Sequence, residues 1–341
     1  MRAVRLHAPG DPLRLEEVPL PSPVGTEVRI RVAGCGVCHT DLHIADGTQP
    51  RVTLPLTLGH EVAGWIDALG PDVDTALALG DPVVVHGGWG CGKCRDCLAG
   101  AEQRCELSRA PGFQLDGGYA EAMLVPHARH LVPIGSLDPV RAAPLADAGI
   151  TPYRAVRRAE PWLVPGARVL LIGCGALGQF ALQFLRLVPD AGGELFVGVR
   201  ELSPARLERA TELGADIGLL DGEPEMTREA LAGPADVVLD FVGTDATLAH
   251  AAEVVAADGL IVLVGEAGGS LGFGFERPAV ESWLTTVAWG SLDDLQAVVR
   301  LAERRRLRWE VEAVPLEDAA SAHARLRAGE VDGRLVLAPA G

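Results

Sequence analysis

The chain has 341 residues, of which 48% are hydrophobic and 22% are charged, and its 46 acidic and 30 basic residues give a formal net charge of -16. That length exceeds one ordinary hydrophobic core and predicts two domains. The net negative charge would repel the phosphate backbone of a nucleic acid, so we expect no nucleic acid as a partner. The longest apolar stretch, residues 168–189, is interrupted by glycine, glutamine and arginine, so we predict no membrane span.

The first residues of the chain alternate apolar and polar side chains, as a β-strand does. They lack the continuous apolar segment of a secretory signal peptide. The sequence therefore predicts that the protein stays in the cytoplasm.

Four candidate metal ligands lie far apart in the first half of the chain. They fall in the segments GCGVCHTDLH (34–43), GHEVAGWI (59–66) and PLADAGITPY (144–153), and they are Cys38, His60, Glu61 and Asp147. Such spacing is typical of a metal site assembled by the fold rather than by one loop. Each residue alone is weak evidence, because the histidine could be an ordinary core residue and the aspartate could cap a helix that follows it.

Four cysteines cluster in a short, glycine-rich segment. Cys91, Cys94 and Cys97 have the spacing C-x2-C-x2-C, and Cys105 follows eight positions later. Four thiolates can enclose one tetrahedral zinc ion and leave no open position for a substrate, so this pattern predicts a structural zinc site. An iron–sulfur cluster usually places its fourth cysteine differently. Reduced thiols without a metal are the other alternative.

A strand, a glycine-rich turn and a helix are predicted from residue 168 onward. Gly173, Gly175 and Gly178 have G-x-G-x-x-G spacing, which lets a dinucleotide pyrophosphate approach the N-terminus of the helix. One of the following helices has Ser203 as its N-cap. Further apolar strands are predicted at residues 194–199, 216–220, 236–242 and 259–265. This alternation predicts a parallel, doubly wound sheet, which is a Rossmann domain.

An acidic residue follows the second of these strands. Glu201 would accept the adenosine ribose hydroxyls of NAD. Arg200 precedes it, and an arginine there could instead bind the 2'-phosphate of NADP. We favour NAD and keep NADP as the alternative.

A strand and a helix are also predicted beyond the Rossmann domain. Residues 285–307 predict a strand and then an amphipathic helix capped by Ser291. One domain is expected over residues 1–152, with the cysteine lobe at 88–108, and residues 289–341 are expected to complete it. The Rossmann domain is expected over residues 153–288.

The order of these motifs resembles one family nearly end to end. GCGVCHTDLH, LGHEVAGWI, the four-cysteine lobe and the glycine-rich turn follow one another as in the zinc-dependent medium-chain alcohol dehydrogenases. The segment PLADAGIT is similar to that of the bacterial secondary-alcohol branch. The resemblance implies an α/β protein, with a Rossmann doubly wound parallel sheet and a mainly β, GroES-like catalytic domain that carries a structural zinc lobe.

The resemblance implies two zinc ions in each chain. Cys38, His60 and Asp147 would hold the catalytic ion, Glu61 would be able to approach it, and the four clustered cysteines would hold the structural ion. Many members of the family have cysteine at the third ligand position, and a carboxylate there makes the ligand set harder. Cys35 and Cys174 are expected to pack without binding metal.

The resemblance implies that two residues of the segment CHTDLH transfer the proton of the alcohol substrate. By resemblance Thr40 would take this proton and His43 would relay it, although His43 could equally be a surface histidine. Leu42 and Trp89 would shape the substrate pocket.

Four further residues would contact the cofactor by resemblance. These are His39 and Arg334 at the phosphates, Arg206 at the ribose and the backbone near Trp289 at the nicotinamide amide. For Arg206 the alternative is a solvated helix charge, and for Trp289 an ordinary core residue.

The resemblance implies reversible hydride transfer between NAD and a small alcohol, secondary or benzylic, with polyols also possible. Homodimers or homotetramers are expected. Two alternatives stay open: a zinc-free NADPH-dependent quinone or enone reductase of the same fold, and a non-enzymatic zinc redox sensor.

Overall fold

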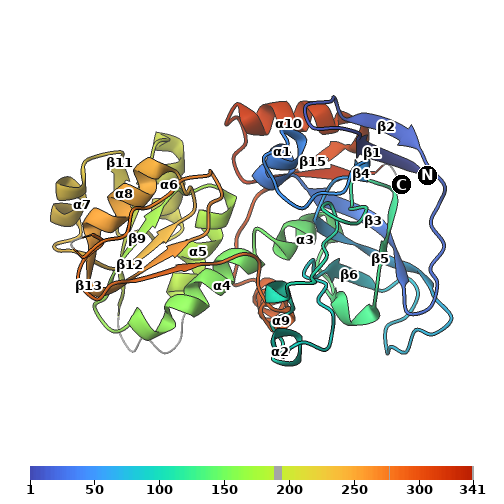
Figure 1. The fold of residues 1–341 in the computed structure, drawn as a ribbon, viewed down its shortest axis with the longest axis horizontal. Helices are drawn as coiled ribbons and strands as arrows, with labels where there is room; N and C mark the ends of the chain where they lie inside the picture. Colours follow the sequence, from blue (N-terminus) through green and yellow to red (C-terminus); the bar gives the residue numbers. More distant parts are fainter. Residues whose placement is uncertain (188–193, 276, 340–341) are drawn as a thin grey trace. The chain divides into compact units, whose positions relative to one another are not determined.

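The computed structural model describes residues 1–187, 194–275 and 277–339. These residues form two compact units, one comprising Met1–Ile150 with Trp289–Gly341 and the other Thr151–Ala288 (Figure 1). We call them unit 1 and unit 2. Unit 1 is discontinuous in sequence, because the chain leaves it at the end of its first segment and returns at Trp289.

Unit 1 is built on two β-sheets. A seven-stranded sheet has the order β15-β16-β3-β5-β6-β8, with β7 paired to β3, and a small sheet has the order β2-β1-β4. The strands are β1 (Arg2–Leu6), β2 (Arg14–Glu17), β3 (Val28–Gly36), β4 (Leu56–Thr57), β5 (Glu61–Leu69), β6 (Pro82–Val85), β7 (Ala122–Val125), β8 (Leu131–Pro133), β15 (Val311–Pro315) and β16 (Arg334–Ala338). The helices are α1 (His39–Ala45), α2 (Arg95–Leu98), α3 (Pro139–Ala142), α9 (Leu292–Glu303) and α10 (Ala319–Arg327).

The strands of unit 1 enclose a core of aliphatic side chains. Ile30 and Leu337 are fully buried in it, and so is Cys35, as expected for a packing residue. Strand β16 pairs antiparallel with β3, with Leu337 opposite Cys35. This pairing places the C-terminal strand beside β3, which itself pairs with β5 along most of its length.

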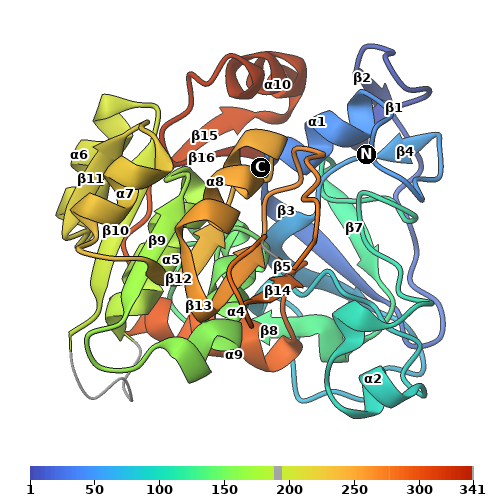
Figure 2. The ribbon, with the colours of Figure 1, turned by 60° about the vertical axis from the view of Figure 1, so that its left-hand side comes forward.

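Unit 2 is a six-stranded parallel sheet with the order β11-β10-β9-β12-β13-β14. Its strands are β9 (Arg168–Ile172), β10 (Phe196–Glu201), β11 (Ile217–Leu220), β12 (Ala235–Asp240), β13 (Val255–Leu263) and β14 (Trp283–Thr286). Its helices are α4 (Ile150–Ala159), α5 (Ala176–Leu187), α6 (Pro204–Glu212), α7 (Pro224–Ala230) and α8 (Asp245–Val254). Figure 2 shows α6 and α8 against this sheet, where α6 packs on β10 and β11 and α8 on β12 and β13. The predicted doubly wound architecture is confirmed.

The predicted helix starts agree with the structure. Ser203 caps α6 through a hydrogen bond from the Arg206 backbone N–H, and Ser291 forms a capping box with Asp294 at the start of α9. The predicted apolar stretch at 168–189 is β9, a turn and α5, and its last two residues lie outside the described part of the chain. Within the described ranges, no helix is both long and apolar enough to cross a membrane.

Candidate metal centre and nucleotide site

The structure brings the four dispersed candidate ligands together in unit 1, and we call these four residues the dispersed cluster. Cys38 is the N-cap of α1, His60 and Glu61 lie at the start of β5, and Asp147 follows a short helical turn. One ligand atom from each lies within 4.8 Å of the others. The Asp147 Oδ2 atom is 3.6 Å from Cys38 Sγ and 3.7 Å from His60 Nε2. Tetrahedral zinc bonds of about 2.0–2.3 Å would separate such ligands by roughly 3.3–3.6 Å, so these three residues fit a zinc ion.

The fourth member of this cluster, Glu61, is held by an arginine. The Arg334 guanidinium forms two contacts with the Glu61 carboxylate, one of them from Nε to Oε2 at 2.9 Å, and it lies 3.8 Å from Asp147 Oδ2. Arg334 is only 5% exposed and Glu61 is fully buried. Burial raises the pKa of Glu61 to about 7 against the opposing effect of Arg334. The predicted cofactor contact of Arg334 stays a prediction.

A third carboxylate, which the sequence analysis missed, lies behind His60. Asp41 is fully buried, its Oδ1 atom is 3.5 Å from His60 Nδ1, and its Oδ2 atom accepts a hydrogen bond from the Cys38 backbone N–H at 2.9 Å. Burial would lower the pKa of His60, but Asp41 and the cluster hold it well above its usual value. Carboxylates commonly orient histidine ligands of metals in this way. The signal in the sequence was the capping-box spacing from Cys38 to Asp41.

Two aromatic rings stand beside His60. The Trp289 ring lies edge-on to it at 5.9 Å, and the Phe113 ring lies at 5.6 Å. A Cβ atom at Gly87 would come within 2.5 Å of the Trp289 ring, so this glycine makes room for the indole. Trp289 also has a left-handed backbone, with φ of 53°. We call Trp289 and Phe113 the aromatic wall; the sequence analysis missed Phe113, which has no local pattern.

Helix α1 carries the predicted proton-transfer residues. Thr40 Oγ1 lies 3.6 Å from Cys38 Sγ, so the structure places Thr40 at the cluster. His43 is half-buried and His39 is exposed on the same helix. Leu42 is only 4% exposed and belongs to the aliphatic core of unit 1.

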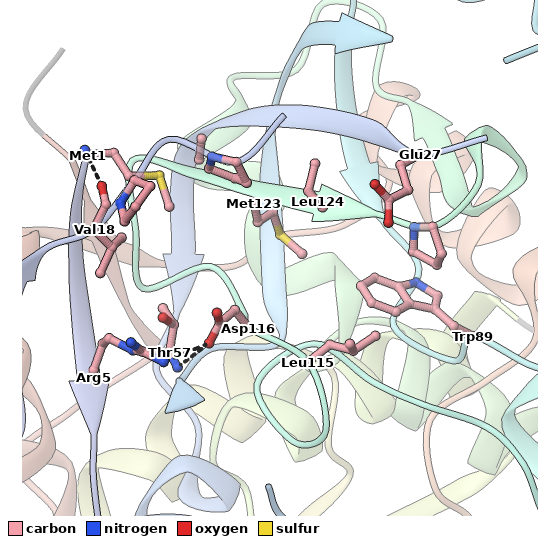
Figure 3. A pocket seen from close by; sticks show the side chains of 14 residues that line it. Met1, Arg5, Val18, Glu27, Thr57, Trp89, Leu115, Asp116, Met123 and Leu124 are labelled. Atoms are coloured by element: carbon pink, nitrogen blue, oxygen red, sulfur yellow. Dashed lines mark hydrogen bonds and ion pairs between the residues drawn. The ribbon is translucent and has the colours of Figure 1, made fainter. Parts of the chain in front are cut away.

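The structure places Trp89 in the wall of a separate cavity of about 400 Å³, which Figure 3 shows. The Trp89 indole N–H donates a hydrogen bond to the His86 carbonyl at 2.6 Å. The lining residues are Met1, Arg5, Val18, Pro19, Pro21, Glu27, Thr57, Trp89, Leu115, Asp116, Ala122, Met123, Leu124 and Pro126. Of the described residues that line this cavity, none belongs to the dispersed cluster, so the substrate contact of Trp89 stays a prediction.

The four clustered cysteines also converge. Their sulfur atoms all lie within 4.8 Å of one another, and Cys91 Sγ is 4.0 Å from Cys97 Sγ. Zinc–thiolate bonds of about 2.3 Å imply sulfur–sulfur separations of roughly 3.8 Å, so this set also fits zinc. Backbone N–H groups of Lys93 and Cys94 lower the pKa of Cys91 to about 6, whereas burial and the neighbouring thiols raise the pKa of Cys97 to about 12. A bound cation is therefore required for all four to be thiolates together.

Each glycine of the turn in unit 2 has a different surrounding. Gly173 has φ of 87°, which a tight turn requires. A Cβ atom at Gly178 would lie 2.2 Å from the Gly173 carbonyl oxygen, so this glycine lets α5 pack against β9. A Cβ atom at Gly175 would meet no heavy atom of the described residues within 4 Å. That open space is where a pyrophosphate would approach the backbone, so the turn fits a dinucleotide.

Glu201 lies against this turn at the end of β10. Its Oε2 atom accepts a hydrogen bond from the Cys174 backbone N–H at 2.7 Å, and its Oε1 atom accepts one from the Leu202 N–H at 2.8 Å. Arg200 forms an ion pair with Asp221. Arg206 is half-buried on α6. The structure therefore brings the Glu201 carboxylate to the glycine-rich turn.

Comparisons with known proteins match both halves of the chain. Residues 25–136 match the alcohol dehydrogenase GroES-like domain, and residues 213–337 match the zinc-binding dehydrogenase family. D-arabinose 1-dehydrogenase (NADP(+)) of Saccharolobus solfataricus is 37% identical over 99% of this chain and 97% of its own. NAD-dependent alcohol dehydrogenase of Sulfurisphaera tokodaii is 36% identical over 99% of this chain and 100% of its own. The crystal structure of the alcohol dehydrogenase of Aeropyrum pernix superposes with a TM-score of 0.92, at 36% identity, covering 99% of this chain and 100% of that one.

Proposed function

Because the chain belongs to the zinc-dependent medium-chain alcohol dehydrogenase family, we propose that it transfers hydride reversibly between NAD and an alcohol–ketone pair. The observation that carries this proposal is the convergence of Cys38, His60 and Asp147 at separations suited to one zinc ion. We further propose small secondary or benzylic alcohols as substrates. The relative named for D-arabinose keeps polyols as the second candidate.

The chain's own residues have distinct tasks in this proposal. A zinc ion held by Cys38, His60 and Asp147 would supply a Lewis acid that makes the alcohol easier to deprotonate, and NAD would supply the hydride acceptor. Thr40, which lies beside Cys38, accepts this proton at its hydroxyl oxygen as it gives up its own, and His43 passes the released proton to solvent. The aromatic wall excludes water from the cluster and limits the width of the substrate.

The two units divide this work. Unit 1 is the catalytic domain and holds a second, structural zinc ion in the cysteine lobe, and unit 2 binds the dinucleotide through its glycine-rich turn and Glu201. The carboxylate of Glu201 favours NAD over NADP, since it would repel a 2'-phosphate. We propose a cytoplasmic homo-oligomer.

Metal analysis of the purified protein, combined with an NAD-linked assay over primary, secondary, benzylic and polyol substrates, tests the proposal. We expect about two zinc ions per chain and turnover with secondary or benzylic alcohols. Reduction of quinones or enones by NADPH without zinc would favour the reductase of the same fold. Zinc in the cysteine lobe alone, released on oxidation and without turnover, would favour the redox sensor.

Replacing Gly175 by alanine should weaken cofactor binding without destabilising the protein. The new methyl group would meet open space in the protein but would occupy the approach of the pyrophosphate. We expect the KM for NAD to rise about tenfold, with the thermal midpoint unchanged. The matched control is Gly272→Ala, because this exposed glycine of unit 2 also faces open space. Equal KM values for NAD in the two variants would contradict the assignment of this turn to pyrophosphate binding.

The edge strand β14 is the proposed contact between two copies of the chain. Strand β14 ends the sheet of unit 2 and exposes Trp283 by 57% and Leu284 by 43%. Nearby in sequence, Phe273 is 79% exposed and Phe275 is 92% exposed. Unpaired edge strands with exposed apolar side chains invite pairing with another chain.

A charge on this edge should therefore separate the subunits. We expect Leu284→Lys to shift the mass measured by light scattering toward the monomer. Leu220→Lys is the matched control, because Leu220 is an exposed leucine on β11, the opposite edge of the same sheet. If only the control variant dissociates, the contact lies at β11 and not at β14.

A further inference from the structure

A series of buried hydrogen bonds leads from the metal cluster to helix α10. The Tyr119 hydroxyl donates a hydrogen bond to Asp41 Oδ2 at 3.1 Å and lies 3.2 Å from His323 Nε2. Asp41 in turn faces His60 across 3.5 Å. Tyr119 and Asp41 are fully buried, and His323 is 6% exposed. Neither Tyr119 nor His323 binds the metal or contacts the cofactor in the proposed function.

The number of available protons fixes the direction of these hydrogen bonds. Tyr119 has a single hydroxyl hydrogen and donates it to Asp41, so its oxygen is left to accept one from His323. This direction requires a hydrogen on Nε2 of His323. Burial lowers the pKa of His323 and raises that of Tyr119, in agreement with neutral forms of both side chains.

The surrounding fold leaves Tyr119 little freedom to move. A Cβ atom at Gly59, the residue before His60, would come within 2.4 Å of the Tyr119 ring, so the ring lies directly against this loop. The Tyr119 backbone N–H donates to the Leu58 carbonyl at 2.9 Å. Packing against this loop thus helps to set the position of the hydroxyl that donates to Asp41.

Helix α10, which carries His323, is fastened to the helix that carries Asp41. The Arg327 guanidinium forms two hydrogen bonds with the Asp46 carboxylate, at 2.7 and 2.9 Å. Asp46 is the C-cap of α1. The exposed Arg327–Asp46 ion pair therefore joins α10 to α1 directly, and the buried contacts from His323 through Tyr119 to Asp41 join the two helices a second time.

We infer that Tyr119 and His323 are positioning residues that hold the Asp41 carboxylate against His60 and so strengthen zinc binding by the dispersed cluster. Two hydrogen bonds on Oδ2, from Tyr119 and from the Cys38 N–H, leave Oδ1 directed at His60. A carboxylate fixed in this way orients the imidazole and increases its basicity as a ligand. The inference rests on the proposed function, because it assigns zinc to this cluster.

The test compares zinc affinity in four variants by competition with a chelator. Tyr119→Phe and His323→Leu each remove one link, and we expect each to weaken zinc binding at the dispersed cluster about tenfold. His323→Gln keeps an N–H near the position of Nε2 and should restore the affinity. Tyr153→Phe is the matched control, since Tyr153 is the other tyrosine of the chain and lies in unit 2.

The cobalt-substituted protein gives a second readout, independent of turnover. Its absorption bands report the ligand field, so we expect a shift in Tyr119→Phe and none in Tyr153→Phe. Unchanged affinity and bands in Tyr119→Phe would overturn the inference, even if the thermal midpoint fell. A wild-type protein that binds zinc in the cysteine lobe alone would overturn the proposed function itself, which is a different result.

Discussion

Replacing Asp147 by alanine is expected to reduce the zinc content from about two ions per chain to one and to abolish measurable alcohol oxidation. Asp147 Oδ2 lies close to both Cys38 Sγ and His60 Nε2, so its loss leaves two ligands facing an open side. A catalytic metal contributes several kcal/mol to the transition state, and about 1.36 kcal/mol corresponds to tenfold in rate. We therefore expect kcat/KM to fall at least about 10³-fold.

The control for this prediction is Asp147→Cys. A thiolate keeps one negative charge at the same position and is a good zinc ligand, so this variant should retain both ions and measurable activity. Zinc content is measured by elemental analysis, and activity by the appearance of NADH. Two zinc ions and unaltered kcat/KM in Asp147→Ala would refute the assignment of the catalytic ligand.

Replacing Cys105 by serine is expected to destabilise the protein while sparing the chemistry. The lobe exposes Leu98 by 76% and Leu107 by 69%, so it has little apolar packing of its own, and a structural zinc site can contribute on the order of 10 kcal/mol. Loss of even about 4 kcal/mol would lower the thermal midpoint by roughly 10 °C. One zinc ion should be lost, and freshly prepared protein should keep most of its kcat at low temperature.

Lys93→Ala is the control for the cysteine lobe, because Lys93 lies between two of the cysteines and has no sulfur. This variant should change neither the zinc content nor the midpoint measured by calorimetry. A complete loss of kcat in Cys105→Ser with an unchanged midpoint would show that the lobe takes part in the reaction, contrary to its structural assignment.

The sequence alone was sufficient to predict the sites whose residues lie close together in the chain. The four cysteines lie within fifteen residues and the glycines of the turn within six, so their convergence follows from the backbone between them. The parallel sheet of unit 2 also followed, because its apolar strands alternate with amphipathic helices. For the dispersed cluster, the order of the motifs and their resemblance to a family were needed.

Residues that support the site from elsewhere in the fold were not predicted. Phe113, Tyr119 and His323 reach the cluster or Asp41 only through tertiary packing, and nothing near them in sequence marks that role. The pairing of Glu61 with Arg334 joins residues 273 positions apart. The contact between Glu61 and Arg334 depends on how β16 pairs with β3, and the periodicity of the sequence does not determine that pairing.

The late position of β16 has a consequence for the order in which the protein assembles during translation. Arg334 supplies the positive charge beside Glu61, and its strand follows every other strand of unit 1 in the sequence. Until the ribosome has released that strand, a closed unit 1 would enclose an uncompensated carboxylate, which costs several kcal/mol. Unit 2 is one uninterrupted segment and has no such dependence, so it can fold while the rest of the chain is still being made.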